Sequence, residues 1–307
     1  MTQRLSEALE EWLLARTGEV SARTLKTYRK RGMDLIHSLG DRPAGELTVG
    51  ELRRWRADLV TRSRRTPPHD GPLSVWSVRG IIRTCKIWFR WLHREGLIPE
   101  DPMARLQMPP APSVMPKAVS DDDLTALLAA ARQHHPRDYA LVCFLAETGC
   151  RAGGAAGLRL GDLDIAAGRA IVREKGRGGK KARTVFFGDV TRAALAAWLS
   201  ERAELEPATD RMFTDLLNPD RGITPSGIYQ ALGRLAQRAG IEGRFNPHSF
   251  RHGFARRLLQ NGADLGTVSQ LMGHSDIAVT SMFYARWSAA ELQERYHRFN
   301  RLPGAAD

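Results

Sequence analysis

In this 307-residue chain, one stretch combines a helix start with residues suited to a phosphate site: Asn246-Pro247-His248-Ser249-Phe250-Arg251-His252. Proline is well tolerated in the first turn of a helix, where its missing N–H has no partner, so Pro247 predicts that a helix begins here. His248 and Arg251 are three residues apart and therefore project from one face of that helix. A histidine that titrates near neutrality beside a permanently charged guanidinium suits a phosphate site. Such pairs are also common on ordinary helices, so the stretch needs support from elsewhere.

A second stretch follows it, from Leu271 through Gly273-His274 to Tyr284. With a turn at Gly273, residues 265–284 fit a helix–turn–helix whose apolar positions are Leu265, Val268, Leu271 and Ile277. That pattern is typical of a DNA-binding module without chemistry, and taken alone it favours this interpretation over a catalytic one.

Upstream, the pattern predicts a mixed region with helices near residues 121–133, 137–147, 189–202 and 224–239. Strand-like segments lie at 163–165, 169–173 and 183–187. The last two flank Glu174-Lys175-Gly176-Arg177-Gly178-Gly179-Lys180-Lys181. We expect a mobile, cationic hairpin tip here, which suits contact with a phosphate backbone. A merely solvated loop is the alternative.

Prolines divide the chain. Pro109, Pro110, Pro112 and Pro116 cannot continue a helix, so residues 108–118 are predicted to be a linker between a domain at 1–107 and another at 119–307. The net charge is +12 and the pI about 10.2, which favours a polyanionic partner. Residues 1–118 hold 21 Lys and Arg against 13 Asp and Glu, so most of the excess charge lies there.

The first domain looks helical throughout, with an apolar stripe at Leu5, Leu9, Trp12 and Leu13. Thr48 and Glu51 form a capping box that opens a helix to about residue 59. On the helix predicted over 75–95, one face is apolar, with Val78, Ile82, Cys85, Phe89 and Leu92. The other face is basic, with Arg79, Arg83, Lys86, Arg90 and Arg94. A second basic stripe, on a helix near 23–37, consists of Arg23, Lys26 and Lys30. Two stripes favour contact with DNA over a solvated surface.

Several classes of protein are disfavoured. The N-terminus has three glutamates and no long apolar run, so it does not resemble a signal peptide. The longest apolar stretch, 139–146, is too short to span a bilayer. Cys85, Cys143 and Cys150 have no metal or disulfide spacing, which fits a reducing cytoplasm. Cys150 is expected to be a small packing residue.

Four motifs taken together resemble the tyrosine recombinase (phage integrase) family, in its Xer-like or mobile-element members. They are Thr148-Gly149-Cys150-Arg151, the lysine hairpin, His248-x-x-Arg251-His252, and Gly273-His274 followed by Tyr284. The resemblance covers 119–307 by specific motifs and 1–118 only generally. It implies a mainly α fold: an N-terminal helical bundle, the SAM-like core-binding domain, and an α+β catalytic domain with a small antiparallel sheet, together forming a C-shaped DNA clamp.

The resemblance also implies residue roles. Tyr284 is the nucleophile, Arg151 and Arg251 clamp the scissile phosphate, His248 and His274 handle protons, and Lys175 protonates the leaving 5′ oxygen. Lys180 or Lys181 could replace Lys175, and Tyr296 could replace Tyr284. No cofactor or metal is expected. The residues expected to contact DNA are Arg23, Lys26, Lys30, Arg79, Arg83, Lys86, Arg90, Arg177, Lys180 and Lys181.

The implied activity is site-specific cleavage and rejoining of double-stranded DNA through a 3′-phosphotyrosyl intermediate and a Holliday junction, for integration, excision or resolution. Two copies are expected on each site and four in synapsis, at the nucleoid in the cytoplasm, with a second recombinase or accessory protein as a further possible partner. Ser288 and Glu291 predict a helix over 288–300, donated to a neighbouring subunit or packed on its own. The alternatives are a type IB topoisomerase and a non-catalytic helix–turn–helix regulator.

The sequence departs from the family pattern in two places. The family usually has an acidic residue three positions after the first arginine, where this chain has Gly154. Arg151 is therefore less well supported, or another side chain takes over. The step from His274 to Tyr284 is ten residues, where many relatives have nine.

Overall fold

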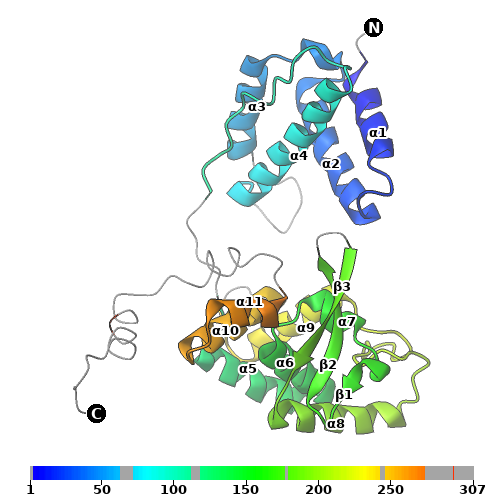
Figure 1. Cartoon of the computed structure of the whole chain (residues 1–307), viewed down its shortest axis with the longest axis vertical. Coiled ribbons are helices and arrows are strands. Elements are labelled where there is room, and N and C mark those ends of the chain that lie inside the picture. Colours follow the sequence, from blue (N-terminus) through cyan, green and yellow to red (C-terminus); the bar gives the residue numbers. More distant parts are fainter. Residues whose placement is uncertain are drawn as a thin grey trace. The chain divides into compact units, whose positions relative to one another are not determined.

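The computed structural model describes residues 3–62, 72–111, 118–176, 179–242 and 246–273, together with Gln293. The chain divides into two compact units, Met1–Val114 and Met115–Asp307 (Figure 1). The described part is mainly helical and contains a small three-stranded antiparallel sheet, which confirms the expected fold class. Within these ranges, no helix is long and apolar enough to cross a bilayer.

The described part of the first unit contains four α-helices and a short 3₁₀ turn at Ala44–Glu46. Serine and threonine side chains begin three of the helices by accepting a backbone N–H one turn on: Ser21, Thr48 and Ser74. The Thr48–Glu51 capping box is confirmed. The helices are α1 (Leu5–Ala15), α2 (Ala22–Leu39), α3 (Val49–Thr61) and α4 (Val75–Arg94).

The core of the first unit is aromatic and aliphatic. The ring of Trp12 stacks on Tyr28 at 4.9 Å and on Trp88 at 6.2 Å between centroids. The apolar face predicted for α4 is buried as expected, since Val78, Ile82, Cys85, Phe89 and Leu92 are all at most 2% exposed. The predicted α1 stripe is buried too.

In the second unit, α6 (Pro136–Thr148) is the central helix and packs against α5 (Asp121–His134), α8 (Asp189–Glu204) and α10 (Pro247–Gln260) (Figure 1). Its apolar stretch, 140–146, is buried on every side. The unit is completed by α7 (Ala152–Gly157), α9 (Pro225–Arg238), α11 (Leu265–Met272) and a 3₁₀ turn at Leu160–Asp162.

The sheet has the order β1 (Leu163–Asp164), β2 (Arg169–Gly176), β3 (Gly179–Phe186). The expected eight-residue loop at 174–181 is wrong, because the antiparallel ladder continues through it: Glu174 pairs with Lys181, Lys175 with Lys180 and Gly176 with Gly179. Only residues 177 and 178 separate the two strands. Each further pair continues the backbone hydrogen bonding of the ladder, so the strands extend to Gly176 and Gly179.

Substitution of Phe144 tests the hydrophobic core of the second unit. Its ring contacts Phe187 and Phe213, each at 6.0 Å between centroids, and it is fully buried. We expect Phe144→Ala to lower the free energy of unfolding of the second unit by about 3–5 kcal/mol in urea denaturation, because the substitution leaves a cavity. The control is Phe186→Ala, since Phe186 is 56% exposed and should change stability by less than about 1 kcal/mol. Equal losses would contradict this account of the core.

Candidate active site

Arg151 stands where two helices meet. Gly149 ends α6 in the left-handed conformation, with φ +56°, and a Cβ there would collide with the ring of Phe254. Arg151 is then the N-cap residue of α7, directly before the first residue of the helix. Its side chain is 34% exposed, so it is open to a ligand.

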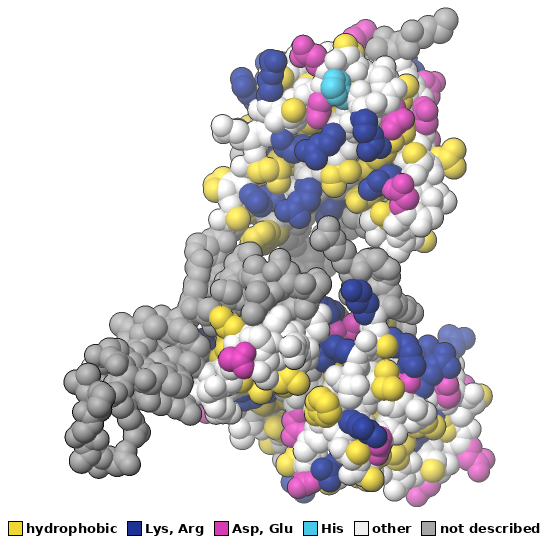
Figure 2. All heavy atoms as spheres, in the orientation of Figure 1, with side chains coloured by type: hydrophobic (Ala, Val, Ile, Leu, Met, Phe, Trp, Pro, Cys, Tyr) yellow, Lys and Arg dark blue, Asp and Glu magenta, His cyan; other side chains and the backbone are white. Residues whose placement is uncertain are grey.

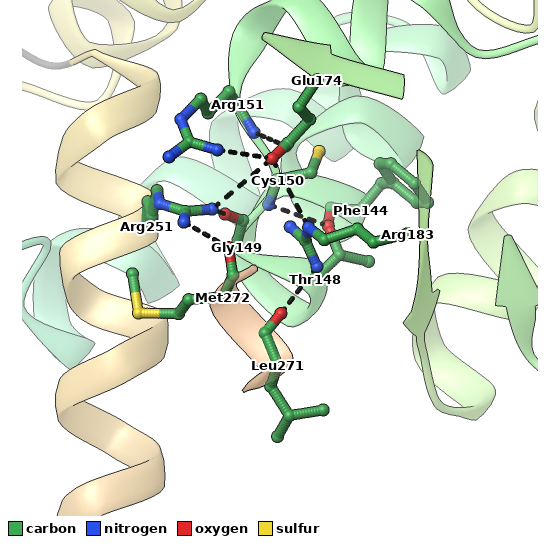
Figure 3. Close-up of polar contacts among 10 residues, drawn as sticks. All are labelled: Phe144, Thr148, Gly149, Cys150, Arg151, Glu174, Arg183, Arg251, Leu271 and Met272. Atoms are coloured by element: carbon green, nitrogen blue, oxygen red, sulfur yellow. Dashed lines mark hydrogen bonds and ion pairs between the residues drawn. The ribbon is translucent and has the colours of Figure 1, made fainter. Parts of the chain in front are cut away.

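Arg251 lies on α10 and is 4% exposed. Its Nη1 donates to the carbonyl oxygen of Gly149 at 2.8 Å, and its Nη2 donates to that of Met272. One guanidinium therefore joins the C-terminal ends of α6 and α11 (Figure 3). Asn246 fixes the start of α10, because its Oδ1 accepts the backbone N–H groups of His248 and Ser249. The predicted start of this helix at Pro247 is confirmed.

Glu174 lies between the two arginines, and the sequence analysis did not identify it. Its Oε2 accepts a hydrogen bond from Arg151 Nη1 at 2.7 Å and lies 3.9 Å from Arg251 Nη1 (Figure 3). Its Oε1 accepts the backbone N–H of Arg151 at 2.5 Å. The signal was available in strand alternation, since Ala170, Val172 and Glu174 share the buried face of β2. The predicted strand stopped one residue short of it.

Arg183 on β3 was also missed. Its Nε lies 3.4 Å from Glu174 Oε2, and its Nη1 donates to the carbonyl oxygen of Leu271 at 2.6 Å. This residue therefore connects the sheet to the end of α11. Burial alone would raise the pKa of the Glu174 carboxyl, but the charges of the surrounding arginines and the Arg151 N–H hold it below its ordinary value. The carboxylate is thus ionised at neutral pH.

The two histidines of α10 are held in the neutral form. Partial burial lowers the pKa of His248, and the positive charges of Arg151 and Arg251 lower it further. Burial lowers the pKa of His252 to about 4, with added effects of His248 and Arg251. A neutral imidazole can accept a proton, which a general base requires.

Arg151 and Arg251 lie against the same Glu174 carboxylate, and their charges act on His248, so these three residues lie close together. Their catalytic roles stay predictions. Lys175 is in β2 directly after Glu174, and its side chain is not among those described. Arg177, His274, Tyr284, Tyr296, the second half of the helix–turn–helix pattern and the expected helix over 288–300 lie outside the described residues, apart from Gln293. Cys150 is fully buried and its pKa is raised to about 12 by that burial, which confirms a packing role.

The basic stripes of the first unit are only partly available to a ligand. Arg23, Lys26, Lys30, Arg83 and Arg90 are exposed. Lys86 instead donates to the carbonyl oxygens of Met103 and Ala104, at 2.6 and 3.3 Å, and Arg79 donates to that of Pro109. Arg79 also lies over the ring of Trp76. Figure 2 shows Lys and Arg side chains gathered on the visible face of this unit, among hydrophobic ones.

Comparison with known proteins identifies the class. A model of the phage integrase family matches residues 117–291. The chain is 32% identical to the tyrosine recombinase XerD of Listeria monocytogenes serotype 4b, over 96% of this chain and 98% of that protein. Its fold is similar to that of the Tn1549 transposon integrase in complex with a circular intermediate DNA, with a TM-score of 0.79 and 18% identity over 96% and 99% of the two chains.

A lambda integrase tetramer bound to a Holliday junction has the same fold, with a TM-score of 0.73 and 16% identity over 94% and 80% of the chains. The chain therefore belongs to the phage integrase family of tyrosine recombinases, the class that the helical fold and the paired arginines define. Within that family it is Xer-like, and it is a DNA strand-cleaving and rejoining enzyme. These matches give no support to the topoisomerase or the non-catalytic regulator.

The pKa of His252 gives a prediction about stability. Between about pH 6.5 and 4 the unfolded chain binds a proton at this histidine that the folded protein does not, so this contribution to stability is lost as pH falls through that window. We expect His252→Gln to lessen the decline in the free energy of unfolding between pH 6.5 and 4. His93→Gln, at an exposed position on α4, is the control and should leave the decline as in the wild type. An unchanged decline in His252→Gln would show that this residue does not carry it.

Proposed function

We propose that this protein recombines specific DNA sites by cleaving and rejoining strands through a 3′-phosphotyrosyl bond to Tyr284. The observation that carries the proposal is the convergence of Arg151 and Arg251, from different helices, beside His248. Permanent positive charge from two planar donors suits a phosphodiester, whose pentavalent transition state gathers negative charge. Membership of the family supplies the kind of reaction.

The proposed chemistry balances without a cofactor. The Tyr284 oxygen attacks the scissile phosphorus, the bond from phosphorus to the 5′ oxygen breaks, and Lys175 gives that oxygen a proton. In this proposal, the charges of Arg151 and Arg251 favour ionisation of the tyrosine, whose ordinary pKa is about 10. The new bond is again a phosphodiester, so the 5′ hydroxyl of another strand can attack it and rejoin the DNA without ATP. His248 and His274 would move protons or hold the phosphate and the tyrosine.

The DNA substrate and the assembly are part of the proposal. We expect two copies on each site and four in synapsis, with a Holliday junction between two rounds of exchange. The lambda integrase tetramer on such a junction supports this arrangement through its shared fold. The exposed Arg23, Lys26, Lys30, Arg83 and Arg90 are proposed to contact phosphates, with Arg177, Lys180 and Lys181 on the hairpin. Such an enzyme would act on DNA at the nucleoid in the cytoplasm, with or without an accessory protein.

Trapping the covalent intermediate tests the nucleophile. A nicked suicide substrate, from which the cleaved end diffuses away, should give a protein–DNA band that resists denaturation. We expect Tyr284→Phe to abolish this band, because phenylalanine has no oxygen to attack phosphorus. Tyr296→Phe is the matched control and should retain it. A band that survives Tyr284→Phe but not Tyr296→Phe would transfer the role to Tyr296.

Salt dependence tests the basic face of α4. Each phosphate contact contributes about 0.9 to the slope of log K against log salt, so Arg83→Ala with Arg90→Ala should reduce the slope by about two. The control is Arg53→Ala with Arg54→Ala, which removes the same charge from exposed positions of α3 outside both stripes. If the slope changes equally in both double variants, or in neither, Arg83 and Arg90 do not make specific phosphate contacts.

A further inference from the structure

Glu174 collects arginines from three separate segments onto one carboxylate. Arg151 reaches it from the start of α7, Arg183 from the neighbouring strand and Arg251 from α10 (Figure 3). The carboxylate accepts two hydrogen bonds from Arg151: Oε1 accepts one from the backbone N–H, and Oε2 accepts one from the guanidinium. Both the start of α7 and the direction of the Arg151 side chain are therefore fixed from β2.

Gly154 leaves the space in which this carboxylate lies. A Cβ at position 154 would be 3.0 Å from both Cγ and Oε1 of Glu174, closer than most real Cβ contacts. Its neighbour Gly153 is different, since a Cβ there would meet nothing within 4 Å. Position 154 is thus the point of α7 from which a longer side chain could reach the place that Glu174 now fills.

The repulsion among the three arginines explains why a carboxylate is needed here. Three guanidinium groups and one carboxylate have a net charge of +2, which can still attract an anionic phosphate. Arg251 is 4% exposed and Arg183 has only 14% of its side chain exposed, so water can relieve little of their repulsion. Removing one partner from a buried ion cluster leaves uncompensated charge that displaces the groups around it.

We propose that Glu174 is a positioning residue for strand cleavage, holding Arg151 and Arg251 in the arrangement that receives the scissile phosphate, in the space that Gly154 leaves open. Glu174 acts through the two arginines and does not touch DNA. This inference rests on the proposed function and deepens it, by assigning the support of the arginine pair to β2 instead of α7.

The first test compares single-turnover cleavage of the nicked suicide substrate by the wild type and by Glu174→Gln, which keeps the shape and removes the charge. We expect the rate to fall by about a hundredfold, as a small misplacement of the clamp would cause. Binding of the same DNA should stay within about threefold of the wild type, since affinity is dominated by the many contacts to other phosphates. Asp162→Asn is the matched control, because it removes the charge of another buried carboxylate, whose 2.6 Å ion pair is with Arg173 and not with one of the three arginines around Glu174.

The second test moves the acid to α7. Glu174→Ala with Gly154→Glu should recover at least tenfold of the cleavage that Glu174→Ala loses, because the carboxylate again reaches Arg151. Glu174→Ala with Gly153→Glu restores the same charge at a position facing open space and should recover nothing. If Glu174 were needed only for folding, the two double variants would cleave DNA at the same rate. The comparison also stands if Glu174→Gln fails to fold, provided that both double variants fold.

Three results would overturn the inference: cleavage by folded Glu174→Gln at the wild-type rate, an equal loss in Asp162→Asn, or double variants that fold and cleave alike. The proposed function fails in a different way, by the absence of any Tyr284-dependent adduct in the wild type. An adduct that depends on Tyr284 and forms equally well without Glu174 would leave the function standing and remove only the role of Glu174.

Discussion

The arrangement of the site depends on one ionised carboxylate inside a group of arginines. The Glu174 carboxylate lies within ion-pair distance of Arg151, Arg183 and Arg251, two of which are largely buried, and it offsets their mutual repulsion. With it, α7, α10 and the sheet are tied to one point, and Arg183 and Arg251 extend the connection to the carbonyl oxygens at the end of α11. A buried ion cluster is weak evidence for stability, because desolvation opposes it. What it does supply here is a fixed direction for each guanidinium.

Three glycines leave the space that the side chains of this cluster and its neighbours occupy. Gly149 ends α6 sharply enough for Arg151 to start the next helix, and Gly154 keeps the space beside the carboxylate clear. Gly273 ends α11 at φ +64°, where a Cβ would crowd the Arg183 side chain. The chain leaves α11 there towards His274. Close approach of the backbone to the side chains of Phe254, Glu174 and Arg183, in addition to the left-handed φ of Gly149 and Gly273, therefore accounts for these three glycines.

Much of the fold could be predicted because its signals are local. Capping residues, proline positions and apolar periodicity gave every predicted helix in the described ranges to within about two residues, and the family motifs located Arg151, His248 and Arg251. Glu174 and Arg183 could not be found in the same way, because their roles depend on strand pairing. A glycine-rich, charged segment predicts a loop when taken alone, and only the register with the opposite strand shows that Glu174 continues the buried face. The local propensity of residues 174–181 favours a loop, but pairing with the opposite strand extends the sheet through most of this segment.

The basic stripe of α4 shows the same limit on the surface. Periodicity establishes that Arg79, Arg83 and Lys86 share a face, but it does not say what else covers that face. The segment after α4 returns along it, and its carbonyl oxygens at Met103, Ala104 and Pro109 take the donors of Lys86 and Arg79. Burial also lowers the pKa of Lys86, whose ammonium group donates to carbonyl oxygens of the protein. Of the α4 residues assigned to DNA, the exposed Arg83 and Arg90 keep their charge available to a polyanion. A net charge of +12 therefore overstates the charge that is available to a polyanion, because some of these cations donate hydrogen bonds to carbonyl oxygens within the protein.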